Sequence, residues 1–323
     1  MKTVDKARAA IARIKAHDPV SKVRDDLSSD ASDWFRISAK AYALHLKEAR
    51  KERDEVQKKP HVAATPNEVI DEILAINEGL SRVALCIPAI STLSDVNAVK
   101  LLMKEMPASE RLLLSLVETM TLEPRIRALQ NIGRIRQFKI FKEFAHIVEA
   151  ATVSYYRGNY VSSYLTLVPV IEGLILRWSG YTGRGEKPEF EEIRRFFSIS
   201  HVRQPCPSVP LFHNVFAKAC HRIINDHLYK PSGYGTAHSE FNRHQASHLL
   251  RDSDFATREN CIRLFLLLDL MAEIYRYETW CDDPRWYLED SDISKEVSLY
   301  SAMLASSHSG VSPESLLLKK AVR

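Results

Sequence analysis

Apolar side chains recur at intervals of three and four residues along most of the chain, and this helical period is what most constrains its fold. In the first segment, Val4, Ala7, Ile11 and Ile14 fall on one face of a helix. Strands half-buried in a sheet need alternating apolar and polar residues, and that pattern is almost absent. Glycine is also scarce, at 10 of 323 residues, which disfavours glycine-rich phosphate loops and turn-dense β-sandwiches. The sequence therefore predicts an all-α protein.

Turn and cap signals divide the helical pattern into segments. Thr65, Pro66 and Glu68 predict a helix start with Thr65 as its N-cap, and Gly158 with Asn159 predicts a stop. The predicted helices cover residues 1–17, 31–58, 65 towards 88, 94–106, 109–121, 135–157, 160–179, 191–198, 211–228, 238–250 and 257–277, followed by a mixed tail with a short helix that begins at Ser312 and Pro313.

The length of the chain suggests about two domains, at ~150 residues per domain. We expect an N-terminal helical domain of unknown role over residues 1–130 and a helical bundle over residues 131–290. A C-terminal tail with a short helix is expected over residues 291–323. The boundary between the first two units is placed near residues 122–135.

Charge, cysteine spacing and hydropathy indicate a cytoplasmic chain. The formal net charge is +4, which permits a nucleic-acid partner without requiring one. Five widely spaced cysteines without a C-x-x-C pair are typical of a reduced compartment and form neither a disulfide framework nor a zinc ribbon. The first residues contain no apolar signal region, and the apolar stretches 164–178 and 261–274 are interrupted by charged side chains. We therefore expect no membrane association.

Residues 124–142 carry six basic side chains and no acidic one. This stretch is compatible with phosphate contacts, and Arg134, Arg136 and Lys139 are its predicted RNA-binding residues. The competing interpretation is a solvated helix face that lies next to acidic side chains of a neighbouring segment.

The segment 239–248 is the most informative for function. It places Arg243, His244 and His248 on one predicted helix, with the two histidines a turn apart. A zinc protease also uses two histidines at this spacing, but Gln245 stands where its general base would be a glutamate. A second interpretation is a metal or structural cluster, since six of the 12 histidines lie between residues 213 and 248. The third is a metal-free ribonuclease, in which histidine transfers protons and arginine clamps a phosphate.

The motif from Arg243 to His248 resembles the signature of the HEPN superfamily, in which arginine, a polar residue, three further residues and histidine follow one another. Two further segments, Tyr155-Tyr-Arg-Gly-Asn-Tyr160 and Leu167-Val-Pro-Val-Ile-Glu-Gly173, are similar to blocks of bacterial HEPN-like proteins linked to abortive infection. A leucine-rich helix that contains Asn260 follows in the same order. The resemblance covers about residues 140–280, and it departs from the family at Leu249, where relatives usually have glycine.

The resemblance implies a metal-independent endoribonuclease without a cofactor. It would cleave RNA by attack of the RNA's own 2′-hydroxyl, in phage defence or toxin–antitoxin growth arrest. His248 would be the general acid/base, Arg243 the phosphate clamp and His244 a polar support. The family also implies a homodimer with two motifs at one cleft, and an antitoxin or another defence protein as a partner. The alternative, from another functional class, is a non-catalytic HEPN-like module that binds RNA or protein.

Other polar residues have competing interpretations. Glu172 lies in an apolar helix, where it either orients Arg243 or a site histidine, or forms an ion pair elsewhere, for example with Arg177. Asn242 either holds the motif helix, touches RNA, or is simply exposed. Four tyrosines, at positions 155, 156, 160 and 164, either stack on bases or pack in the core.

Overall fold

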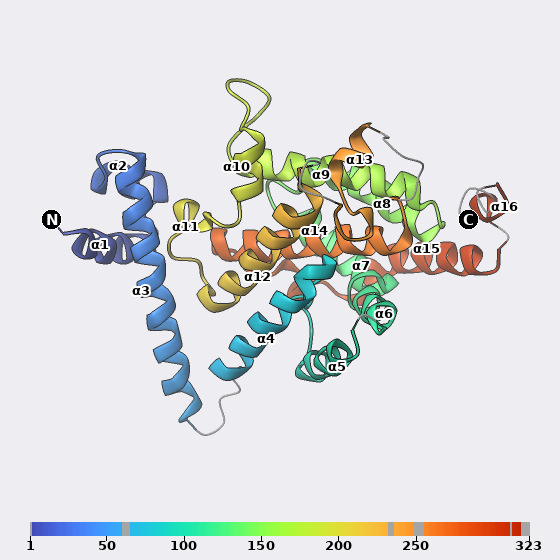
Figure 1. Cartoon of the computed structure of the whole chain (residues 1–323), viewed down its shortest axis with the longest axis horizontal. Helices are drawn as coiled ribbons and strands as arrows, with labels where there is room; N and C mark the ends of the chain where they lie inside the picture. Colours follow the sequence, from blue (N-terminus) through green and yellow to red (C-terminus); the bar gives the residue numbers. More distant parts are fainter. Residues whose placement is uncertain are drawn as a thin grey trace.

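The computed structural model describes residues 2–59, 65–106, 108–231, 236–248, 255–310 and 312–317, without the side chains of Ser247, His248 and Ser315. Every regular element in those ranges is helical, so the predicted all-α class is confirmed (Figure 1). The helices are α1 (Thr3–Lys15), α2 (Val20–Leu27), α3 (Ala31–Gln57), α4 (Asn67–Leu80), α5 (Leu93–Lys104), α6 (Glu110–Leu122), α7 (Pro124–Gln130), α8 (Ala145–Tyr156), α9 (Tyr160–Trp178), α10 (Phe190–Arg195), α11 (Ser200–Arg203), α12 (Pro210–Ile223), α13 (Arg243–His248), α14 (Arg258–Thr279), α15 (Asp290–His308) and α16 (Pro313–Leu317).

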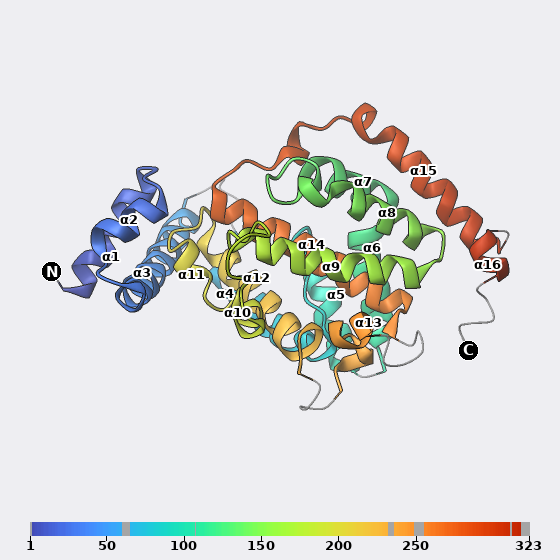
Figure 2. The same ribbon diagram turned by 90° about the horizontal axis from the view of Figure 1, so that it is seen from above.

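Helix α14 is the central element of the fold. Its side chains from Asn260 to Ile274 are buried on every face, which requires other helices all around it. Helices α6, α9 and α12 supply that cover, and α8 packs in turn on α9 (Figure 2). At its start, the hydroxyl of Thr257 accepts a hydrogen bond from the backbone N–H of Asn260 at 3.1 Å, as an N-cap should.

The hydrophobic cores divide after α3, whereas the sequence suggested a boundary near residue 130. The main core runs from Ile70 in α4 to Tyr300 in α15, and it includes side chains on both sides of the expected boundary. A second, smaller core joins α1, α2 and α3 with Cys206. The reason is that α4 packs against α12, and α6 packs against α14, so these N-terminal helices cover the apolar surface of the C-terminal ones.

Helix α3 attaches the small core to the rest of the molecule through polar contacts and through Leu46 and Ala49, which pack against the main core. The indole N–H of Trp34 donates to the carbonyl of Val202 at 2.9 Å. The hydroxyl of Tyr42 lies 2.9 Å from Nδ1 of His213. Figure 1 shows α3 as the long helix beside the main body, with α11 and α12 next to it.

Three local predictions need correction. Helix α4 begins at Asn67 without a side-chain cap, and the carbonyl of Thr65 instead accepts a hydrogen bond from Arg53. The helix predicted over 135–157 begins only at Ala145, because the turns before it place Phe138 and Phe141 in the core. The tail forms the 19-residue helix α15, whose Tyr300 packs in the main core.

Helix α9 contains Pro169 and is, among the described helices, the one long and apolar enough to cross a membrane by length and composition alone. A core helix passes the same test. Tyr164, Leu167 and Ile171 of α9 are fully buried within the main core. This environment accounts for its apolar sequence.

Candidate functional site

The chain turns sharply before it enters the motif helix. A single 3₁₀ turn, η6 (His238–Glu240), contains left-handed backbone at Ser239 and Glu240, with φ of 49° and 56°. Asn260 of α14 fixes this turn, because its side-chain amide donates to the carbonyls of Ser239 at 2.7 Å and Phe255 at 2.8 Å. The helix predicted from residue 238 therefore begins only at Arg243, since left-handed residues cannot continue a right-handed helix.

Asn242 holds the start of the motif helix in place. Its Oδ1 accepts a hydrogen bond from the backbone N–H of His244 at 2.8 Å, which is the N-cap geometry. Its Nδ2 donates to the carbonyls of His227 and Lys230, each at 3.0 Å. With 7% of its surface exposed, Asn242 is not the exposed residue that one interpretation expected. The interpretation in which it holds the helix is confirmed.

Arg243 forms an ion pair with Glu172 of α9. The distance from Nε of Arg243 to Oε2 of Glu172 is 2.7 Å, and their side chains are 27% and 14% exposed. Arg177, the alternative partner considered from the sequence, pairs with Glu143 instead. Of the two interpretations of Glu172, the structure shows the pairing with Arg243. Glu172 also lies 3.2 Å from the ammonium group of Lys187.

Two aromatic rings flank the Arg243 guanidinium. Its central carbon lies 5.3 Å from the ring centre of Tyr229 and 6.0 Å from that of Phe190, within range of cation–π attraction. Tyr229 follows η4 (Ile224–Leu228) and is buried, and burial together with the charge of Glu172 raises the pKa of its phenol well above the usual value. Tyr229 therefore stays protonated and supports Arg243 as a neutral ring.

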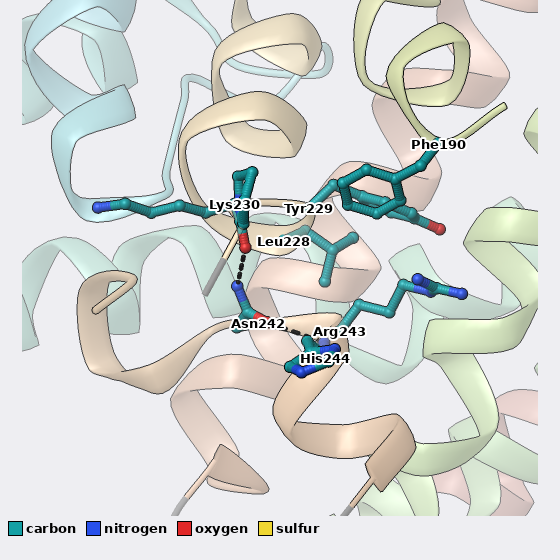
Figure 3. A pocket seen from close by; sticks show the side chains of 8 residues that line it. Phe190, Leu228, Tyr229, Lys230, Asn242, Arg243 and His244 are labelled. Carbon is teal, nitrogen blue, oxygen red and sulfur yellow. Dashed lines mark hydrogen bonds between the residues drawn. The ribbon is translucent and has the colours of Figure 1, made fainter. Parts of the chain in front are cut away.

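A pocket of about 210 Å³ opens beside Arg243. It is formed where α10, the end of η4 and the start of α13 meet (Figure 3). Figure 3 shows the Arg243 side chain reaching from α13 towards the rings of Phe190 and Tyr229, while His244 lies beside Asn242. Lys230 also lines the pocket, but Figure 3 shows its side chain extending away from Arg243, Phe190 and Tyr229. The arrangement presents one fixed guanidinium next to aromatic surface.

The remaining motif residues are described to different extents. His248 is the last residue of α13, and the structure describes its backbone. Its side chain, like the whole of Leu249, lies outside the described residues. His244 is half-buried at the pocket. The structure thus brings Arg243, His244, Asn242 and Glu172 together.

Arg134 is not an RNA-binding residue, contrary to the sequence prediction. Its side chain is 1% exposed and pairs with Asp283, at 2.6 Å, and with Glu273. Nearby, Arg127 is buried against Asp269 at 2.8 Å. Burial between α7, η2 (Asn131–Ile135) and α14 removes both guanidinium groups from solvent, so acidic neighbours explain these two basic residues.

Arg136 and Lys139 are both exposed and remain predicted RNA contacts. Arg136 lies within ion-pair distance of Glu149 and Glu296. Lys139 lines a separate cavity with Arg177 and Trp178, at the other end of α9 from Tyr160. These two residues therefore do not form part of the pocket at Arg243.

Most histidines and tyrosines singled out in the sequence have structural partners. His213, His227 and His238 lie within hydrogen-bond distance of Glu278, the carbonyl of Ser81 and Glu110, respectively. Within the described ranges, no group of three or more histidine, cysteine, aspartate or glutamate side chains is placed to hold a metal ion. The tyrosines at positions 155, 156 and 164 are buried, so they pack in the core, while Tyr160 is partly exposed.

Phe190, Tyr229 and Lys230 are pocket residues that sequence reasoning missed. They lie in a short helix and after a π-helical turn, outside the motif, and no spacing rule connects them with it. No protein-family model, curated protein or solved structure matches this chain. What the protein does is therefore inferred from the side chains at this pocket and from the order of the sequence motifs.

Proposed function

We propose that the protein is a metal-independent endoribonuclease of HEPN type. The observation that supports it best is the Arg243 guanidinium, which Glu172 holds at the edge of an open pocket on the helix that ends at His248. A guanidinium donates several N–H groups in one plane and matches the oxygens of a phosphate. The ion pair with Glu172 holds Arg243 beside the pocket, where its guanidinium can donate to a phosphodiester.

In the proposed reaction, the 2′-hydroxyl of RNA attacks the adjacent phosphorus and the bond to the 5′-oxygen breaks. One histidine takes the proton of the 2′-hydroxyl, and a protonated histidine gives a proton to the leaving 5′-oxygen. Arg243 neutralises the charge that develops on the phosphate oxygens. The products carry a 2′,3′-cyclic phosphate, or a 3′-phosphate after hydrolysis, and a 5′-hydroxyl. No metal or cofactor takes part.

Two proton-transfer groups are needed, and we propose that a homodimer supplies them as two copies of His248. His244 then supports the site as a polar group. In a monomer, His244 and His248 would have to divide the two roles between them. The biological role that fits this chemistry is RNA cleavage that arrests growth, in phage defence or under the control of an antitoxin. The proposed location is the cytoplasm.

The test is cleavage of RNA by the purified full-length protein in excess EDTA. We expect cleavage in EDTA by a species that sediments as a homodimer. His248→Ala should lower the rate by roughly 10²–10⁴-fold, because it removes proton transfer. Arg243→Lys should also lower the rate of RNA cleavage strongly, since an ammonium group cannot make the bidentate contact with a phosphate.

Matched controls are His146→Ala, which changes an exposed histidine of α8, and Arg222→Lys, which changes the arginine of a surface pair with Glu78. Both should cleave RNA like the wild type. Full cleavage by His248→Ala would refute the assignment. RNA binding without any cleavage by the wild type would support the non-catalytic module instead.

A further inference from the structure

The pocket beside Arg243 has the size and lining for a small planar group. Its volume of about 210 Å³ is below the ~300–1,000 Å³ typical of pockets for drug-sized ligands. One side is the guanidinium of Arg243, which the proposed function assigns to a phosphate. Any second group of the substrate that enters the pocket is therefore attached close to that phosphate.

Phe190 is the exposed aromatic surface of this pocket. As the first residue of α10, it follows a capping box in which Glu189 and Glu192 fix the start of the helix. Its ring centre lies 5.7 Å from that of Tyr229, which is fully buried, so a second ring supports it from behind. Even so, 42% of Phe190 is exposed. A ring that is supported by a second ring and is partly exposed to solvent suits stacking against another flat ring.

Two polar side chains of the pocket, those of Asn242 and Lys230, are already used within the protein. Asn242 is the amide at the pocket, and both ends of its side chain are already used in backbone hydrogen bonds. Lys230 directs its ammonium group to the carbonyl of Thr236, 3.2 Å away. The groups that remain beside Arg243 include the aromatic face of Phe190, and an aromatic face next to a positive charge accepts any base.

We propose that this pocket is a nucleobase subsite, in which an unpaired base next to the phosphate held by Arg243 stacks on Phe190. The inference rests on the proposed function for the identity of the ligand. The inference adds Phe190 as a residue that contacts the substrate. It also adds a specificity, because the site would distinguish a nucleotide that has a base from one that lacks it and would accept different bases. A base inside a duplex is already stacked on its neighbours and cannot enter.

The experiment measures binding to two labelled probes, an unpaired oligoadenylate and an abasic ribose-phosphate chain of the same length. All measurements use full-length protein with His248→Ala, so that cleavage does not interfere. We expect Phe190→Ala to weaken binding of oligoadenylate by about 5-fold to about 150-fold, the range for loss of one stacked base. Binding of the abasic chain should not change. Phe190→Trp should restore binding of oligoadenylate.

Phe35→Ala is the matched control, because Phe35 is also 42% exposed but lies on α3. It should bind both probes like the parent protein. Equal weakening of both probes by Phe190→Ala would overturn the inference, since it would show a disturbed Arg243 and not a lost stack. Unchanged binding of oligoadenylate by Phe190→Ala would also overturn the inference. If Phe190→Ala cleaves RNA as fast as the wild type, the proposed ribonuclease function still stands. If the wild type binds oligoadenylate more tightly than the abasic chain but cleaves no RNA, the ribonuclease function is refuted and the base subsite is not.

Discussion

Glu172 is the residue that turns Arg243 from a flexible surface side chain into a positioned one. An arginine loses substantial rotamer freedom when it is fixed, and a bound phosphate would otherwise have to supply that ordering. The ion pair at 2.7 Å fixes Nε before any ligand arrives. The buried ring of Tyr229, the nearer of the two rings, limits the remaining movement of the guanidinium. Glu172 is therefore a positioning residue for the proposed reaction.

We expect Glu172→Ala to lower RNA cleavage by about tenfold, which corresponds to about 1.4 kcal/mol of transition-state stabilisation, because Arg243 loses the carboxylate that positions it. Glu172→Gln should recover only part of the rate, since its amide oxygen keeps a partial negative charge beside Arg243 but not the full charge of the ion pair. Glu78→Ala, which removes the surface partner of Arg222, is the control. Equal rates for Glu172→Ala and Glu78→Ala would contradict the positioning role. Rates are compared at matched protein stability, measured by thermal unfolding.

The intrinsic helical propensity of its residues does not make the motif helix α13 stable. It has six residues from Arg243 to His248, and isolated helices shorter than ~12–15 residues are marginal in water. Its start is fixed by Asn242, and the turn before it is fixed by Asn260. Two asparagine side chains from different segments therefore decide where the motif residues lie.

Asn242→Ala should lower the free energy of unfolding by about 1–2 kcal/mol, because it removes an N-cap and two buried hydrogen bonds. It should also abolish cleavage, since α13 is no longer held. Asn159→Ala is the control: Asn159 caps α9 through the backbone N–H of Ser162 at 3.1 Å. That variant should lose about 1 kcal/mol of stability, the value for one N-cap, measured by urea denaturation, and keep its cleavage activity. A cleaving Asn242→Ala protein would show that the cap has no role in the site.

Across the whole molecule, buried ion pairs connect helices that are distant in sequence. Arg127 and Arg134 reach α14 and the segment after it, at Asp269 and Asp283. Burial acts to raise the pKa of Asp283, but hydrogen bonds from Arg285 and Arg134 outweigh it and hold that pKa well below its usual range. Removing one partner from such a pair leaves a charge buried without compensation.

The stability of the protein should therefore fall in acid. A carboxylate with a depressed folded-state pKa stabilises the fold fully above its unfolded pKa of ~4, and this contribution is lost as the pH drops towards the folded value. Asp283→Asn should lower the free energy of unfolding by about 3 kcal/mol at neutral pH. Between about pH 5 and pH 3, the free energy of unfolding should then fall less steeply than in the wild type. Urea denaturation across that range measures both. Asp282→Asn, at an exposed neighbour, should change neither; an Asp283→Asn protein with wild-type stability would rule out this account.

Local patterns in the sequence were enough to predict the helical class and most helices. The apolar period and the caps act over a few residues, so the bounds of α1, α3 and α14 follow closely from residues 1–17, 31–58 and 257–277. The pairing of Glu172 with Arg243 was one of two alternatives, because a carboxylate in an apolar helix needs a partner but its sequence does not say which. The spacing of Arg243 and His248 is likewise a property of the sequence alone.

Only the tertiary structure decided which charged groups are buried and which segments meet. Arg134 belongs to a stretch that looks like an RNA-binding face, yet its partner Asp283 lies 149 residues away. The start of α13 depends on Asn260, and the pocket on Phe190 and Tyr229, all outside the motif. The physical reason is the range of the interactions: periodicity and capping are set by neighbours in sequence, whereas burial and ion pairing depend on helices that become neighbours only when the chain packs around α14.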